Sequence, residues 1–362
     1  MKELMKRREC RTVSAAGLPI GGGAPITVQS MTNTDPHDFE ACLRQTRLLA
    51  DAGCDIVRLT VPDKQAARVF SYLRESGIRL PLVADIHFDH TLALEAIAAG
   101  ADKIRLNPGN VGGAEHVREV AAACRAAGVP IRIGVNGGSL ERELLAKYGG
   151  PTAEALAESA LSHAALLEAC DFYDIVLSVK ASTVTTMIAA NRLLAERCDY
   201  PLHLGVTEAG GERIGTVKSA VGIGALLAEG IGDTVRVSLT ADPVREVLAA
   251  REILDSLGLS ARPRMQIVSC PTCGRTRIDL VALGEAFETA AAREGLLDLP
   301  LTVALMGCAV NGPGEAREAD IGIAGGRGEA LLFEHGEVIG KIPEGAVIET
   351  LLSRIRELAG RG

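Results

Sequence analysis

The stretches Lys103-Ile-Arg-Leu-Asn107 and Pro130-Ile-Arg-Ile-Gly-Val-Asn136 set the pattern of most of this 362-residue chain. In each, branched apolar residues alternate with polar ones, which is typical of a β-strand. The Ala-rich segment between them, residues 114–127, is typical of a helix. Eight such runs occur, each followed by an Ala/Leu-rich stretch: Ile26–Asn33, Asp55–Val61, Pro81–His87, Lys103–Asn107, Pro130–Asn136, Asp174–Ser182, Pro201–Glu208 and Asp233–Thr240. Eight successive β-α units predict an α/β fold, a closed (β/α)8 TIM barrel.

An open, doubly wound sheet is the alternative architecture. It is disfavoured because no G-x-G-x-x-G sequence opens the first helix. The preceding segment Thr12–Gly23, rich in glycine, is interpreted as a hairpin that closes the N-terminal mouth of the barrel.

A second, small α+β domain is predicted after the linker Ala261-Arg-Pro-Arg264. We expect residues 1–260 to form the barrel and residues 265–362 to form this domain. Its predicted elements are the strand Met265–Ser269, the helix Asp279–Glu294, the strands Leu301–Met306 and Asp320–Ala324, the hairpin Glu329–Ile342 and the helix Ala346–Leu358.

Basic residues stand near the ends of five predicted strands. Residues two apart on a strand share a face, and the inward residues at the carboxyl ends of barrel strands build the active site. The candidates for substrate binding are Arg58, Arg105, Asn107, Arg132, Asn136, Lys180, Arg236 and Ser238. Only Asp85 and Glu208 oppose these cations, so the excess predicts a small, multiply charged anion such as a diphosphate. The alternative is that internal ion pairs satisfy some of the arginines or that they point outward.

Two histidines also lie on these strands. His87 follows Asp85 by two residues and is the better candidate for chemistry. His203 is interpreted as structural, because a lone histidine near a strand end is more often a packing residue than a catalyst.

Three cysteines and a glutamate form a ligand pattern in the second domain, within Ser269-Cys-Pro-Thr-Cys-Gly-Arg275 and Gly307-Cys-Ala-Val-Asn-Gly-Pro-Gly-Glu315. Cys270, Cys273 and Cys308 resemble an iron–sulfur ligand set that lacks the usual fourth cysteine. Glu315 is predicted as a displaceable fourth ligand, since a carboxylate exchanges at iron more easily than a thiolate. A zinc site and a redox-active dithiol are the alternatives, but neither explains the Gly-Pro-Gly-Glu loop.

Composition excludes several classes of function. The net charge of −8, with 38 basic and 46 acidic residues, disfavours binding to nucleic acid and to anionic membranes. No apolar run reaches the ~20 residues of a membrane span, and the basic N-terminus lacks an apolar signal segment. Six of the nine cysteines are scattered without the paired spacing of a disulfide framework, so we expect a cytoplasmic protein.

Several segments together resemble one family, the 4-hydroxy-3-methylbut-2-enyl diphosphate synthases. Besides the two cysteine loops they are Ala24-Pro-Ile-Thr-Val-Gln-Ser-Met-Thr-Asn-Thr34, Ala84-Asp-Ile-His87, Ile104-Arg-Leu-Asn-Pro-Gly-Asn110, Arg132-Ile-Gly-Val-Asn-Gly-Gly-Ser139, Val179-Lys-Ala-Ser182 and Gly205-Val-Thr-Glu-Ala-Gly210. The resemblance implies a barrel similar to dihydropteroate synthase, joined to a domain similar to those of sulfite reductases that carries a [4Fe–4S] cluster.

The resemblance also implies an activity. The family reduces 2-C-methyl-D-erythritol 2,4-cyclodiphosphate with two electrons to a linear allylic diphosphate, on the methylerythritol phosphate route to isoprenoids. It implies flavodoxin or ferredoxin as electron donor and a homodimer in which the cluster domain of one subunit serves the barrel of the other. Asp85, His87 and Glu208 are then expected to contact substrate hydroxyls or transfer protons, together with Glu315. The alternative from another class is an electron-transfer protein whose barrel only binds a metabolite.

Overall fold

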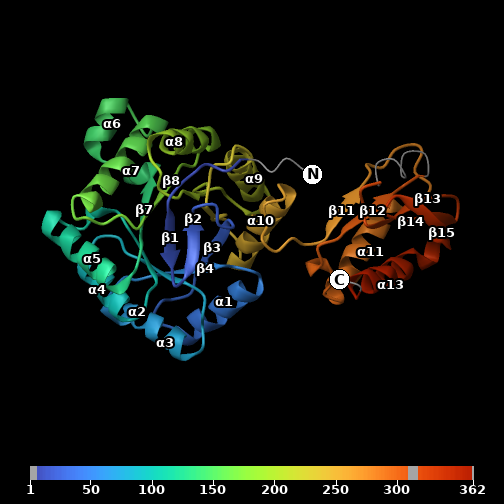
Figure 1. Cartoon of the computed structure of the whole chain (residues 1–362), viewed down its shortest axis with the longest axis horizontal. Helices are drawn as coiled ribbons and strands as arrows, with labels where there is room; N and C mark the ends of the chain where they lie inside the picture. The colour runs from blue at the N-terminus through green and yellow to red at the C-terminus, as the bar shows by residue number, and fades with distance from the viewer. Residues whose placement is uncertain (1–5, 309–316, 361–362) are drawn as a thin grey trace. The chain divides into compact units, whose positions relative to one another are not determined.

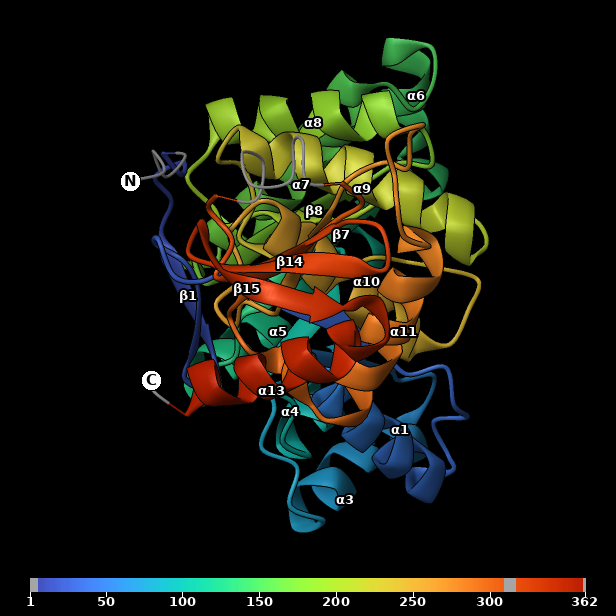
Figure 2. The same ribbon diagram turned by 90° about the vertical axis from the view of Figure 1, so that its right-hand side faces the viewer.

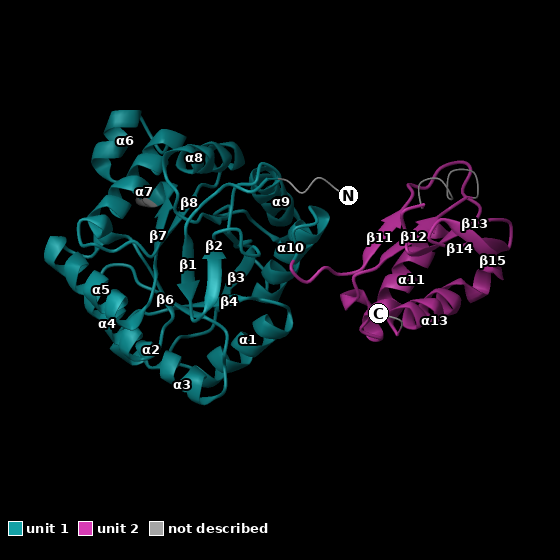
Figure 3. Ribbon diagram, in the orientation of Figure 1, with its two compact units in different colours: residues 1–260 teal, residues 261–362 magenta. Residues whose placement is uncertain are grey.

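The computed structural model describes residues 6–308 and 317–360. The chain divides into two compact units, Met1–Ser260 and Ala261–Gly362 (Figure 3). Each unit has its own hydrophobic core.

The first unit is a parallel eight-stranded barrel, as predicted. Its strands are β3 (Thr27–Met31), β4 (Ile56–Thr60), β5 (Leu82–Asp85), β6 (Lys103–Leu106), β7 (Ile131–Asn136), β8 (Ile175–Lys180), β9 (His203–Leu204) and β10 (Thr234–Val235). Neighbouring strands pair in parallel, in the order β8-β7-β6-β5-β4-β3-β10-β9. A parallel bridge between Leu177 and Leu202 joins the first and last strands of this order and closes the barrel.

Helices surround the strands and cover their outward apolar residues (Figure 1). They are α1 (Phe39–Asp51), α2 (Lys64–Ala67), α3 (Val69–Glu75), α4 (His90–Ala98), α5 (Ala114–Ala127), α6 (Arg142–Tyr148), α7 (Ala153–Glu168), α8 (Val184–Arg197), α9 (Glu212–Ala228) and α10 (Pro243–Ser256). In α5 the buried residues Val117, Val120, Ala121 and Cys124 recur at helical spacing, which gives the helix one apolar face against the barrel. Gly128 ends α5 in the left-handed conformation that glycine adopts without steric cost.

The last two strands are shorter than predicted. The sequence favours strands over Pro201–Glu208 and Asp233–Thr240, but β9 and β10 have two residues each. One further hydrogen bond joins the Arg236 N–H to the Leu204 carbonyl at 2.9 Å. Glu208 then takes a positive φ of 52°, which turns the chain away from an extended course.

The predicted hairpin at the N-terminus is confirmed. Strands β1 (Thr12–Ala15) and β2 (Leu18–Gly21) pair in antiparallel fashion. Their side chains Val13, Ala15 and Ile20 pack with Ile56, Val83 and Val176, which lie near the starts of three barrel strands. The hairpin therefore closes the N-terminal mouth of the barrel with apolar contacts.

The second unit is a five-stranded sheet with helices on one face. The strands are β11 (Gln266–Ser269), β12 (Thr302–Met306), β13 (Ile321–Gly325), β14 (Glu329–Glu334) and β15 (Glu337–Pro343). The first three are parallel, and β14 and β15 form an antiparallel edge (Figure 2). The helices α11 (Leu280–Arg293) and α13 (Val347–Ala359) pack against Leu305 and Ile323 in the main core of this unit. These bounds lie within three residues of the predicted ones.

No helix in the described part of the chain is both long enough and apolar enough to cross a membrane.

Candidate active site

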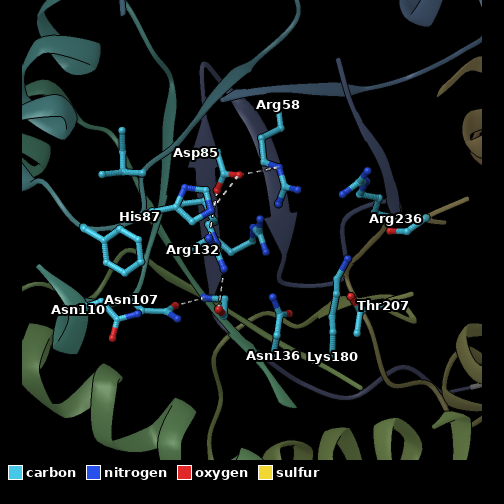
Figure 4. A pocket seen from close by; sticks show the side chains of 15 residues that line it. Arg58, Asp85, His87, Asn107, Asn110, Arg132, Asn136, Lys180, Thr207 and Arg236 are labelled. Carbon is cyan, nitrogen blue, oxygen red and sulfur yellow. Dashed lines mark hydrogen bonds and ion pairs between the residues drawn. The ribbon is translucent and has the colours of Figure 1, made fainter. Parts of the chain in front are cut away.

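The carboxyl ends of the barrel strands surround a polar cavity of about 270 Å³. All eight residues predicted to bind substrate line it, and so do Asp85 and His87. Figure 4 shows Arg58, Arg132, Lys180 and Arg236 reaching it from four different strands or strand ends. The two-residue periodicity predicted from the sequence is the reason, because each of these side chains lies on the inward face of its strand.

Asp85 is the centre of an ion-pair network on one wall of the cavity. Its carboxylate oxygens lie 3.3 Å from Arg105 Nη1, 3.8 Å from Arg58 Nε and 4.0 Å from His87 Nε2. Burial by itself raises the pKa of Asp85, but the charges of Arg58 and Arg105 outweigh it and hold the pKa below its ordinary value. Asp85 is therefore a carboxylate that fixes two arginines at the cavity wall.

The second buried carboxylate at the site is Glu246, which the sequence analysis missed. It lies in the first turn of α10, 3.3 Å from Arg236 Nη2, and accepts hydrogen bonds from Ser30 Oγ and the Leu239 N–H at 3.0 Å each. The interpretation that Glu208 opposes the barrel cations together with Asp85 is thus corrected: among the described residues, Arg236 pairs with Glu246. The turn Pro243-Val-Arg-Glu246 gives no local signal of this role, because a charged residue also precedes Glu246 there.

Arg132 and Lys180 form no ion pair within residues 6–308 and 317–360. Both are buried, at 2% and 7% exposure. Burial, followed by the charges of Arg236 and Arg132, lowers the pKa of Lys180 well below its ordinary value. Burial and the neighbouring Arg58 and Arg105 likewise lower the pKa of Arg132. A bound anion would relieve this repulsion. The alternative considered from the sequence, that internal ion pairs satisfy the cations, holds for Arg58, Arg105 and Arg236 but not for Arg132 and Lys180.

Two inward-facing glycines make room for the cations. A Cβ atom on Gly134 would lie 2.6 Å from Arg105 Nε, and one on Gly205 would lie 2.7 Å from Lys180 Nζ. The Gly134 carbonyl accepts a hydrogen bond from Arg105 Nη2 at 2.9 Å, and its N–H donates to Asn107 Oδ1 at 2.9 Å. Backbone at Gly134 thus positions two side chains of the neighbouring strand.

Glu208 lies outside the cationic cavity. It is exposed and lines a neighbouring cavity of about 430 Å³, which shares Asn136 and Thr207 with the first. Thr207, Asn110 and Phe88 also line the cationic cavity and were not predicted. Parity could have identified Thr207, since it stands two residues after Gly205 and four after His203 on the same face.

The cysteine loops lie at the carboxyl ends of two adjacent parallel strands, β11 and β12. Ser269 pairs with Leu305, so the two loops leave the sheet next to each other, and the Gly307 N–H donates to Cys270 Sγ at 3.2 Å. None of Cys270, Cys273 and Cys308 forms a disulfide, and the Arg277 N–H joins the two loops by donating to the Gly307 carbonyl. Glu315 lies outside the described residues, among which no group of three candidate ligands is close enough to hold a metal ion.

Two family models match the chain. The GcpE TIM-barrel domain matches residues 10–251, and the GcpE protein C-terminal domain matches residues 266–357. The chain belongs to the GcpE family. The resemblance inferred from the motifs is thereby confirmed, and the family's two domains correspond to the barrel and to the sheet unit.

Relatives in the GcpE family cover nearly the whole chain. A 4-hydroxy-3-methylbut-2-en-1-yl diphosphate synthase (flavodoxin) from Ruminiclostridium cellulolyticum is 53% identical over 358 residues, 99% of this chain and 100% of that protein. The enzyme of the same name from Symbiobacterium thermophilum is 54% identical and covers 98% of this chain and 95% of its own length.

Two solved structures resemble about two thirds of the chain. A dihydropteroate synthase from Stenotrophomonas maltophilia superposes with a TM-score of 0.51 at 17% identity, over 68% of this chain and 97% of that one. A type I 3-dehydroquinate dehydratase from Clostridium difficile gives a TM-score of 0.50, also at 17% identity, over 69% and 97%. At this identity the similarity concerns the fold only. The expected similarity of the second unit to sulfite reductase domains stays a prediction.

Proposed function

We propose that this chain catalyses the reductive ring opening of 2-C-methyl-D-erythritol 2,4-cyclodiphosphate to (E)-4-hydroxy-3-methylbut-2-enyl diphosphate. The observation that carries the proposal is the cationic cavity, in which Arg132 and Lys180 lack a described counter-charge beside Arg58 and Arg105. A cyclic diphosphate supplies that counter-charge, and guanidinium groups bind phosphate oxygens in bidentate fashion. Membership of the GcpE family and the names of its relatives support this choice of substrate.

In this proposal the barrel residues both bind the diphosphate and assist its departure. Arg58, Arg105, Arg132 and Lys180 hold phosphate oxygens, with Asn107, Asn136, Arg236 and Ser238 completing the donors. As the ring opens, negative charge accumulates on the phosphate oxygen that leaves. Donors already fixed around that oxygen stabilise this charge without reorganising, so they lower the barrier as well as binding the substrate.

Proton transfer is assigned to groups at the edge of the cavity. His87 is half exposed and lies 4.0 Å from the Asp85 carboxylate, so its imidazole can move a proton while Asp85 orients it. Glu208, at the adjoining cavity, is proposed to contact a substrate hydroxyl. This division assigns Asp85 to positioning and His87 to proton transfer.

We assign a [4Fe–4S] cluster to the second unit. Three cysteines without disulfides, on two hydrogen-bonded loops, fit such a group, because a backbone N–H aimed at Cys270 Sγ stabilises a thiolate. Cys270, Cys273 and Cys308 would be three ligands and Glu315 the fourth, exchangeable one. When bound, the cluster supplies electrons one at a time and an iron that acts as a Lewis acid.

The electron donor in this proposal is flavodoxin, which the names of the relatives specify; ferredoxin is the alternative. We further propose a cytoplasmic homodimer in which the unit 265–362 of one subunit serves the barrel, residues 1–260, of its partner. Mixing an Arg132→Met chain with a Cys308→Ala chain tests this arrangement. Restored turnover in the mixture supports it, and two variants that stay inactive when co-refolded contradict it.

The proposed function is tested on protein purified without oxygen. We expect about four irons and four sulfides per chain, and formation of the linear diphosphate from the cyclodiphosphate with reduced flavodoxin. Arg132→Met should lose turnover, whereas Arg118→Met, on the exposed face of α5, should retain it. A protein that accepts electrons but forms no product would instead be an electron carrier with a metabolite-binding barrel.

A further inference from the structure

A second polar layer lies inside the barrel, and the proposed function does not use it. We call it the inner ring. It consists of six inward-facing side chains that are at most 4% exposed: Thr27, Gln29, Lys103, Ser178, His203 and Thr234. An interior of this kind is normally filled by apolar residues.

Strand pairing makes these residues neighbours. Thr234 pairs with Thr27 on one side and with His203 on the other. The bridge between Leu177 and Leu202 places Ser178 next to His203. On the other wall Ile104 pairs with Ile131, so Lys103 and Arg132 are diagonal neighbours on the same inward face.

The inner ring leaves its polar atoms without partners. Lys103 Nζ, both ring nitrogens of His203 and Ser178 Oγ have no hydrogen-bond partner among the described residues. Arg132 lines the substrate cavity, and its Nε and Nη2 atoms are also buried without a hydrogen-bond partner among the described residues. Buried polar groups are almost always satisfied, and lysine and arginine can only donate. The ring has acceptors of its own, such as Gln29 Oε1, but these also lack a partner and so do not reach the two cations. A further acceptor between Lys103 and Arg132 would satisfy both of them.

An anionic acceptor would also offset the charges of Lys103 and Arg132. The buried carboxylates of the barrel are committed, Asp85 to Arg58 and Arg105, Glu246 to Arg236 and Asp233 to Arg7. Burial, followed by the charges of Arg132 and Arg58, lowers the pKa of Lys103 well below its ordinary value. Water would complete the hydrogen bonds but would leave the repulsion between Lys103 and Arg132 unopposed.

We propose that the barrel interior holds a small inorganic anion of the size of chloride, bound by Lys103 and Arg132 and completed by His203 and Ser178. The site is enclosed, since the hairpin β1–β2 packs across the starts of the strands and Arg132 lies toward the substrate cavity. Arg132 belongs to both sites, so the inner anion also fixes the guanidinium that faces the substrate.

Crystals of the full chain grown with sodium bromide in place of chloride test this proposal through the anomalous signal of bromine. We expect a peak at the inner ring in the wild type, and its loss in Lys103→Met, which is nearly isosteric and removes a buried charge. Lys180→Met, whose side chain lines the substrate cavity, is the matched control and should keep the inner peak. An inner ring that holds only water, with bromide confined to the substrate cavity, overturns the proposal.

Thermal unfolding gives an independent measurement that works even where Lys103→Met does not fold. Wild-type protein should melt about 2–4 °C higher in chloride than in gluconate at equal ionic strength, because gluconate is too large to enter. Equal melting temperatures in the two salts contradict the proposal. Neither measurement requires turnover, so the outcome is separate from that of the proposed function.

Discussion

Replacing Gly134 by alanine tests how closely the cavity is built around its arginines. An added Cβ would lie 2.6 Å from Arg105 Nε, 3.1 Å from Nη2 and 3.3 Å from Cζ. Real side chains do not tolerate the shortest of these contacts, so the guanidinium must move. Arg105 is held at both ends of its fork, by Asp85 and by the Gly134 carbonyl, and the move breaks at least one of these contacts.

The expected magnitude follows from the two consequences of that move. Overpacking a tight interior costs about 1–3 kcal/mol of unfolding free energy. If Arg105 also leaves the substrate phosphate, loss of one hydrogen bond to a charged group costs about 1.5–3 kcal/mol. At 1.36 kcal/mol for each factor of ten, kcat/KM should fall about 10- to 150-fold.

The assay compares Gly134→Ala with Gly224→Ala, a glycine of α9 whose added Cβ meets nothing within 4 Å. Urea unfolding gives the stability, calorimetric titration with pyrophosphate gives anion affinity, and turnover of the cyclodiphosphate gives kcat/KM. The control should be as stable as the wild type or more so. If Gly134→Ala binds pyrophosphate and turns over like its control, the position of Arg105 does not matter for the site and the reasoning is refuted.

Three further predictions concern the carboxylates and the thiols. Glu246→Gln should lower the unfolding free energy by about 3 kcal/mol, because it breaks a buried ion pair with Arg236; urea unfolding measures this, and Glu252→Gln on the exposed face of α10 is the control that should not change. The depressed pKa of Asp85 means that its contribution to stability is complete above the unfolded value of about 3.9 and is lost as pH falls through the folded value. Wild type and Asp85→Asn should therefore differ in their urea midpoints at neutral pH and converge as the pH falls below about 4. A difference that stays constant at all pH values would show that the ionised Asp85 carboxylate does not stabilise the fold. Cys273→Ser should lower iron per chain without changing pyrophosphate affinity, whereas Cys170→Ser in the barrel should change neither; full iron occupancy in Cys273→Ser would exclude that thiol as a ligand.

Periodicity made the barrel predictable from local sequence. Runs such as Lys103–Asn107 carry alternating side chains, and alternation in a parallel strand assigns each residue to the inside or the outside without further information. For this reason Arg58, Arg105 and Arg132 were placed correctly at one cavity. The hairpin β1–β2 was predicted on the same local grounds, from its glycines.

Local sequence patterns did not predict contacts between elements that are far apart in the chain. Glu246 lies on α10, and its partner Ser30 is 216 residues away, so no spacing in the chain connects them. The predicted lengths of β9 and β10 were too long, because the length of a hydrogen-bonded ladder depends on where neighbouring strands diverge. Glu208 was predicted as a site residue and Thr207 was not, although Thr207 shares the parity of Gly205 and lines the cationic cavity.

The sequence by itself determined the fold class, the family and the cationic character of the cavity, because these depend on residue type and on a two-residue period. Only the tertiary structure decided which charges are neutralised. Whether an arginine has a carboxylate within 4 Å depends on the curvature of the closed sheet. That curvature brings Asp85 to Arg58 and Arg105, and it leaves Arg132 and Lys180 without a described carboxylate partner. That distribution of paired and unpaired charge, set by barrel closure, is the physical basis of the anion sites proposed above.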